Sequence, residues 1–176
     1  GLLPAEEVAK RCVGMIECGP AAGVLGSKFL GDIMGDANVI AADMGGTTFK
    51  VAVIQGGEIE YARNPLVGRF HYVAPKIEIM SIGAGGGSIV SLDPRTNIPR
   101  IGPQSAGADP GPICYGKGGT QVTLTDVLML IGYLDPEIFL GGAMTLDFDT
   151  TSNIFKRTIA EPMGMSVTEA AIGIYR

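Results

Sequence analysis

The fold of this chain is decided by residues 38–54, which read NVIAADMGGTTFKVAVI. Apolar, β-branched runs lie on both sides of the pair Gly45-Gly46, and this pattern predicts two strands joined by a tight turn. Residues 55–58, which read QGGE, carry the glycine signature of a β-hairpin, so a third strand is expected directly after them. Three consecutive strands joined by glycine turns predict an antiparallel meander.

The other segments carry further strand and helix signals. Apolar runs predict strands over 13–17, 38–43, 49–54, 59–62, 72–82, 88–92 and 98–101. Helical spacing predicts helices over 4–11, 21–30, 126–133, 149–160 and 166–176. Glycine at 31 and proline at 162 are expected to end the second and fourth helices, and Thr125 is expected to cap the third. Ser166 and Glu169 are expected to form a capping box at the start of the fifth. The segment 102–120, rich in glycine and proline, predicts a long loop. The expected class is α/β, a mixed sheet containing the three-strand meander and flanked by helices.

Composition bounds the kind of protein. The chain has 176 residues, enough for one domain, and its 27 glycines are roughly twice the average usage. A net charge of −5 without a basic stripe argues against nucleic acid as a partner, and no apolar run is long enough to span a membrane. Three cysteines without metal spacing indicate reduced thiols and a cytoplasmic protein. The chain begins without methionine and ends inside an expected helix, so we expect a fragment of a larger polypeptide.

The strongest candidate site is the run 43–48, Asp-Met-Gly-Gly-Thr-Thr. The glycines Gly45 and Gly46 allow backbone N–H groups to form a concave nest for phosphate oxygens, and the hydroxyls of Thr47 and Thr48 add donors. Asp43 is able to hold Mg²⁺ directly or through water, because Mg²⁺ takes few carboxylates and keeps several waters. The alternative is a plain hairpin with a Gly-Gly turn and an aspartate at the strand end.

A second glycine run, 83–87, is followed by Ser88. Four glycines in five residues between two strands fit a close backbone approach, either to a nucleotide or to another part of the protein; the alternative is a tight strand connection. In the long loop, Gln104, Ser105 and Asp109 are candidates to face a site, and the alternative is a structural loop that packs on itself.

Three single residues have a functional and a structural interpretation. Cys114 is either a nucleophile or an inert buried thiol. His71, the only histidine, is either a general base or a packed or surface side chain, and its being alone excludes a multi-histidine metal site. Asp126 is most simply a residue of the start of a helix.

Together these motifs resemble the hydantoinase A / 5-oxoprolinase / acetone carboxylase β-subunit family. The resemblance rests on the blocks 19–24, 43–48, 82–89, 102–119 and 123–126, in that order. The family is similar to the actin/heat-shock-chaperone/sugar-kinase superfamily, which binds ATP between two ribonuclease H-like halves. The resemblance implies that residues 1–176 form a single domain, the C-terminal nucleotide-binding half.

The same resemblance implies site residues and chemistry. It implies Asp43 as the catalytic and metal-binding residue, and it implies cofactor-binding positions at Gly45, Gly46, Thr47, Thr48, Gly85, Gly86, Gly87 and Ser88. The implied cofactors are ATP and Mg²⁺, and the implied reaction is hydrolysis of a cyclic amide whose carbonyl is activated by phosphorylation. The family usually has an aspartate where this chain has Lys50, which either reaches a phosphate or leaves the strand to solvent.

Two other functions stay open, and the resemblance implies the same partners for both. The first is the ATP-using subunit of an acetone or acetophenone carboxylase, and the second is a non-catalytic nucleotide-dependent switch or assembly module. The implied partners are a small cyclic amide or ketone, the missing N-terminal half of the chain, and a hydantoinase B-type subunit. Neither nucleic acid nor a membrane is among them.

Overall fold

A computed structural model describes residues 3–63, 66–71 and 75–176. The chain forms two compact units. The first unit consists of Gly1–Asp43 and Phe49–Ile82, and the second consists of Met44–Thr48 and Gly83–Arg176. The assignment of residues 1–176 to a single nucleotide-binding domain stays a prediction.

The sheet of the first unit contains the predicted meander. Strands β1 (Val39–Met44), β2 (Phe49–Gln55) and β3 (Glu58–Ile59) are hydrogen-bonded in that order. Strand β6 (Met80–Ile82) pairs antiparallel with the beginning of β2. The turn between β2 and β3 needs its glycines, because Gly56 and Gly57 have φ angles of 60° and 79°, as a type I′ hairpin turn requires.

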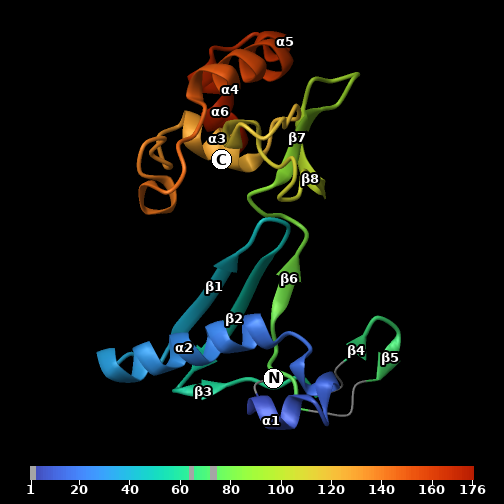
Figure 1. Cartoon of the computed structure of the whole chain (residues 1–176), viewed down its shortest axis with the longest axis vertical. Helices are drawn as coiled ribbons and strands as arrows, with labels where there is room; N and C mark the ends of the chain where they lie inside the picture. Colours follow the sequence, from blue (N-terminus) through green and yellow to red (C-terminus); the bar gives the residue numbers. More distant parts are fainter. Residues whose placement is uncertain (1–2, 64–65, 72–74) are drawn as a thin grey trace. The chain divides into compact units, whose positions relative to one another are not determined.

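Helix α2 (Cys18–Met34) packs on this sheet, as Figure 1 shows. Its buried Ala21 and Val24 share a core with Ala41, Ala52, Ile54 and Ile77. The expected end at Gly31 is wrong, since α2 continues to Met34. A Cβ at Gly31 would lie 2.7 Å from Val39 Cγ2. The glycine therefore serves close packing inside the helix, which ends at Gly35 in the left-handed conformation.

The remaining elements of the first unit are short. They are α1 (Ala5–Val8), η1 (Cys12–Met15), β4 (Leu66–Val67) and β5 (Phe70–His71). The strand predicted over 13–17 is wrong, since an apolar run this short does not distinguish a strand from a helical turn. Of the strand predicted over 72–82, residues 72–74 lie outside the described part, Ile77 forms an isolated bridge with Tyr61, and only 80–82 belong to β6.

The second unit combines a β-hairpin with a group of helices (Figure 1). The hairpin is formed by β7 (Ser88–Leu92) and β8 (Pro99–Ser105), which pair antiparallel. The helical elements are η2 (Ile113–Tyr115), α3 (Leu124–Leu130), η3 (Phe139–Gly142), α4 (Phe148–Phe155), the π-helical turn η4 (Lys156–Ala160), α5 (Glu161–Met163) and α6 (Val167–Tyr175). The apolar faces of η2, α3, α4, η4 and α6 meet around Phe155, whose side chain is fully buried, whereas η3 packs beside a separate cluster around Cys114.

Three boundaries in this unit differ from expectation. The loop predicted over 102–120 begins as strand, since β8 continues to Ser105. Thr123, rather than Thr125, caps α3, because its side chain accepts from the Asp126 amide while the Asp126 carboxylate accepts from the Thr123 amide. The helical segment continues past Pro162, which stands in the first turn of α5, and it ends at Gly164.

The capping box of Ser166 and Glu169 is confirmed. So is the α/β class with an antiparallel meander. None of the helices in the described segments combines the length and the apolar character needed to cross a bilayer.

Candidate functional site

The two glycine motifs form one structure in the second unit. The turn between β1 and β2 is closed by the Gly45 amide, which donates to Thr48 O over 2.9 Å. The Gly86 amide donates to Gly45 O over 3.0 Å, and the Gly87 amide donates to Gly46 O over 2.7 Å. Two runs that lie about forty residues apart in the sequence therefore pair backbone to backbone.

Glycine is required in the second run because side chains would not fit. A Cβ at Gly85 would lie 2.6 Å from Gly45 O and 2.7 Å from Thr47 N. A Cβ at Gly87 would lie 2.9 Å from both Gly46 O and Ser105 Oγ. Of the interpretations left open by the sequence, a close approach to another segment of the protein is therefore the one that the geometry favours.

The amides of this second run are used inside the protein. The Gly85 amide donates to Ser88 Oγ over 2.8 Å, and the Ser88 amide donates to Gly85 O over 2.9 Å. Together with the bonds from Gly86 and Gly87, these contacts engage all four amides. Binding of ATP by these four residues stays a prediction, and the geometry gives them a supporting part, which is to hold the turn.

A cavity of about 460 Å³ opens beside the turn, a size typical of small-molecule sites. It is lined by Met44, Gly45, Gly46, Thr47, Gly86, Gly87, Gly107, Ala108, Pro112, Tyr115 and Thr125. All of these residues belong to the second unit, and none of them carries a formal charge at neutral pH. The polar groups that this lining offers to a ligand are therefore backbone N–H and C=O groups and hydroxyls.

Two amides of the turn are available for that purpose. Within the described residues, no acceptor is hydrogen-bonded to the N–H groups of Gly46 and Thr47, and both residues are exposed. Thr47, which carries a hydroxyl, is itself a lining residue of the cavity. Consecutive N–H groups beside a hydroxyl are the donor set that a phosphate group requires. Thr48 is half-buried and does not line the cavity.

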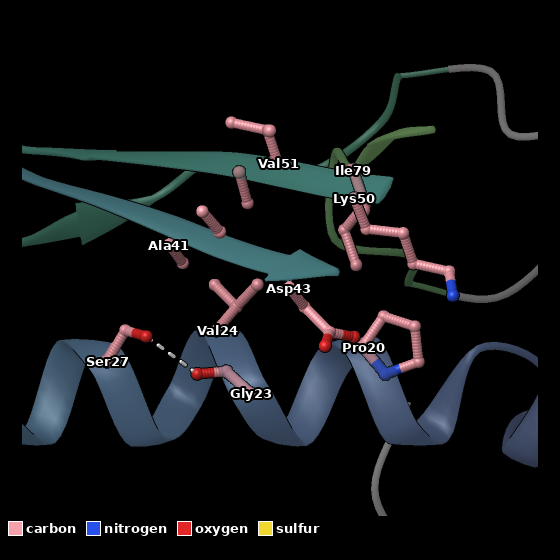
Figure 2. Close-up of a pocket in the computed structure, with 11 residues that line it drawn as sticks. Pro20, Gly23, Val24, Ser27, Ala41, Asp43, Lys50, Val51 and Ile79 are labelled. Carbon is pink, nitrogen blue, oxygen red and sulfur yellow. Dashed lines mark hydrogen bonds between the residues drawn. The ribbon is translucent and has the colours of Figure 1, made fainter. Parts of the chain in front are cut away.

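Asp43 lies in the first unit, where it lines a different cavity of about 240 Å³. Figure 2 shows its carboxylate reaching from the end of β1 toward Pro20 on α2. No donor among the described residues is hydrogen-bonded to that carboxylate, which is exposed. Lys50, the position at which the chain departs from the family pattern, lines the same cavity. The catalytic and metal-binding role of Asp43 stays a prediction.

The donor set fits Mg²⁺ bound to a nucleotide better than a metal held by protein alone. In the part of the chain that the structure describes, no three His, Cys, Asp or Glu side chains gather into a cluster. Mg²⁺ usually takes one or two carboxylates and completes its shell with water and substrate phosphates. The free carboxylate of Asp43 meets that requirement.

For the other candidate residues, the geometry favours a structural role over a functional one. Cys114 is fully buried, and burial together with the nearby Asp126 carboxylate raises the pKa of its thiol far above the usual range, so the thiol is inert. His71 is exposed on β5. Ser105 Oγ accepts from the Gly107 amide over 3.1 Å, whereas Gln104 and Asp109 are not among the residues that line the cavity.

Sequence reasoning missed Tyr115 and Thr125 as residues of the cavity wall. The Tyr115 ring lies 5.8 Å from that of Phe139, and burial raises the pKa of its hydroxyl, which stays protonated and able to donate. The Thr125 hydroxyl and amide both donate to Gly86 O over 2.8 Å. The glycine-rich loop indicated this region of the chain as a candidate site. A sequence pattern does not show, however, which single side chain lines a cavity.

The chain is similar to known proteins in both sequence and fold. A model of the family described as hydantoinase/oxoprolinase matches residues 1–176. The caprolactamase subunit alpha of Pseudomonas jessenii is 40% identical over 174 residues, which make up 99% of this chain and 25% of that protein. A nucleotide-free structure of acetone carboxylase, from work on ATP-dependent acetone carboxylation, superimposes with a TM-score of 0.80 at 41% identity and covers 89% of this chain and 22% of its own. The crystal structure of ATP-dependent caprolactamase from Pseudomonas jessenii gives a TM-score of 0.70 at 42% identity, covering 82% of this chain and 21% of its own.

The chain spans about a quarter of the length of curated relatives such as the caprolactamase subunit alpha and the acetone carboxylase beta subunit.

Proposed function

This chain belongs to the hydantoinase/oxoprolinase family, and we propose that it supplies a phosphate-binding part of the ATP site in an ATP-dependent cyclic-amide hydrolase. The observation that carries the proposal is the pair of amides at Gly46 and Thr47, which have no hydrogen-bond partner among the described residues and belong to two residues that line a cavity of about 460 Å³. A turn that presents consecutive N–H groups and a hydroxyl is suited to phosphate, and the uncharged lining leaves charge neutralisation to a bound cation.

The reaction needs ATP because the carbonyl of a cyclic amide is a poor electrophile. Phosphoryl transfer from ATP to the carbonyl oxygen releases ADP and gives an imidate phosphate, whose carbon is a far better electrophile. Water adds to this carbon, and the ring opens when the C–N bond breaks and the nitrogen leaves as a protonated amine. A second water hydrolyses the resulting acyl phosphate to a carboxylate and phosphate. The phosphoryl transfer depends mainly on positioning and on neutralising charge. The N–H groups of Gly46 and Thr47 would hold phosphate oxygens of a bound ATP, the Thr47 hydroxyl would be a further donor, and Asp43 is the residue that would hold Mg²⁺. That ion, when bound, offsets the negative charge that develops on the transferred group.

The wider assembly is part of the proposal. The fold that we propose for the intact site is of the actin-like ATPase type, with a second ribonuclease H-like half supplied by another part of the protein. Two relatives are named as enzyme subunits, the caprolactamase subunit alpha and the acetone carboxylase beta subunit. We extend this to a hydantoinase B-type partner subunit and to a cytoplasmic location.

A second candidate is the ATP-using subunit of a ketone carboxylase. It is favoured by the match to the nucleotide-free acetone carboxylase structure, whose TM-score of 0.80 is higher than that of the caprolactamase. Turnover separates the two functions. The natural full-length protein, with its partner subunits, is assayed for ADP release with lactams, hydantoin and 5-oxoproline, and separately with acetone plus bicarbonate. Nucleotide-dependent assembly without any substrate-coupled ADP release would instead identify a switch or assembly module.

The variant Gly46→Ala tests the phosphate site itself. A Cβ at Gly46 meets no protein atom within 4 Å, and its φ lies outside the left-handed region, so the fold tolerates alanine. A phosphate held against the Gly46 amide leaves little room for the added methyl group, and we expect the Kd for MgATP to rise at least about tenfold, which is about 1.4 kcal/mol. Calorimetry on the full-length protein measures this value.

The matched control is Gly26→Ala, at an exposed position of α2 where a Cβ also meets nothing within 4 Å. It should leave the Kd unchanged. If Gly46→Ala binds MgATP as tightly as the control does, the turn is not the phosphate site.

A further inference from the structure

We infer that the first turn of α3 positions the lining of the cavity. Thr125 holds the glycine turn, and Asp126 holds the loop of residues 112–115, which also lines the cavity. The inference rests on the proposed function, because it concerns the same site. It assigns a role to two residues that sequence reasoning treated as parts of a helix cap. Both residues are buried, and Asp126 does not itself line the cavity.

Thr125 holds the phosphate turn through an unbroken series of hydrogen bonds. Its hydroxyl and its amide both donate to Gly86 O over 2.8 Å. The Gly86 amide in turn donates to Gly45 O, in the turn itself, over 3.0 Å. The contact is also tight, because a Cβ at Gly86 would lie 2.7 Å from Thr125 Oγ1. A shift of Thr125 is therefore transmitted to the turn.

Asp126 holds the other part of the lining. Its carboxylate accepts from the Cys114 amide over 2.8 Å and from the Ile113 amide over 3.3 Å. It also accepts from the amide and the hydroxyl of Thr123, over 2.8 Å and 2.9 Å. Pro112 and Tyr115, which line the cavity, directly flank the two residues that this carboxylate holds.

A helix cap alone does not require this arrangement. The capping box needs only the mutual contacts of Thr123 and Asp126, whereas the carboxylate takes two additional donors from a loop more than ten residues away. A buried carboxylate that is bonded to four donors is rigid, because losing any one of them leaves a charge poorly compensated. Since Thr125 and Asp126 are adjacent in one helical turn, they fix the distance between the phosphate-binding turn and the loop that carries Tyr115.

The test uses Thr125→Val in the full-length enzyme. Valine keeps the shape and the amide bond to Gly86 O but removes the hydroxyl bond. We expect the KM for ATP to rise about tenfold through misplacement of the turn, while the KM for the organic substrate stays within about twofold. Thr125→Ser restores the hydroxyl and should restore the KM for ATP.

Thr151→Val is the matched control. Thr151 is a fully buried threonine whose hydroxyl donates to Asp147 O over 2.6 Å, and it does not line the cavity. It should lower the melting temperature by an amount similar to Thr125→Val without changing the KM for ATP. If both variants destabilise the protein and neither changes the KM for ATP, Thr125 is merely structural and the inference is overturned.

Hydrogen–deuterium exchange tests the positioning role independently of the proposed function. Thr125→Val should speed exchange at Gly86 and in the 45–47 turn, and Asp126→Asn should speed exchange at Ile113 and Cys114, whether or not the protein uses ATP. Wild-type protein without ATP turnover, but with these exchange changes, would refute the proposed function and retain the positioning role. Unchanged exchange in both variants would refute the positioning role alone.

Discussion

Gly85→Ala is the sharpest perturbation of the contact on which the candidate site depends. The added Cβ would lie 2.6 Å from Gly45 O and 2.7 Å from Gly46 C and Thr47 N. All three are backbone atoms, so no flexible side chain is able to turn away. Reaching an ordinary contact distance of 3.4 Å requires the turn to move by about 0.8 Å relative to Gly85.

The cost of that movement follows from the bonds that it strains. Overpacking a close contact costs about 1–3 kcal/mol. The bonds from the Gly86 and Gly87 amides to the turn lengthen as well, and each contributes about 0.5–1.5 kcal/mol. A local destabilisation of about 3 kcal/mol corresponds to roughly a hundredfold faster amide exchange. The turn that presents Gly46 and Thr47 moves with it, so MgATP binding should weaken too.

Hydrogen–deuterium exchange on the full-length protein measures this effect at the Gly86 and Gly87 amides. The control is Gly83→Ala, which lies in the same glycine run and whose Cβ meets nothing within 4 Å. Exchange in the control should match that of the wild type. If the Gly86 and Gly87 amides exchange equally slowly in Gly85→Ala and Gly83→Ala, the two glycine runs are not in contact. The description of the candidate site would then be wrong.

Two further predictions concern single side chains. Asp43→Asn should lower ATP-coupled turnover by a few hundred-fold, about 3–4 kcal/mol of transition-state stabilisation, with little change in melting temperature; a wild-type rate of ADP release at saturating Mg²⁺ would remove Asp43 from the site. Cys114 should resist iodoacetamide in the native protein even at pH 9, because its raised pKa keeps the thiol protonated as the pH rises, whereas the exposed Cys12 should react under the same conditions. Native alkylation of Cys114 would contradict the burial that raises its pKa.

The sequence by itself determined the elements whose signals are local. The meander follows from β-branched runs and glycine turns, because Gly56 and Gly57 adopt positive φ values that disfavour other residues. The capping box of Ser166 and Glu169 is equally local, since both partners lie within one helical turn. Local signals failed where packing decided the matter, as at Gly31, which sits inside α2 because Val39 leaves no room for a side chain.

Tertiary structure alone decided how the site is assembled. The sequence identified two glycine runs as separate phosphate-binding candidates, but only the fold pairs them, so that the amides of the second run hold the first and the N–H groups of Gly46 and Thr47 stay available. The long-range contacts of Thr125 and Asp126 likewise join segments that are more than ten residues apart. Periodicity reports which face of an element is buried, whereas the partner of a buried hydrogen-bonding group is chosen by the packing of the whole unit.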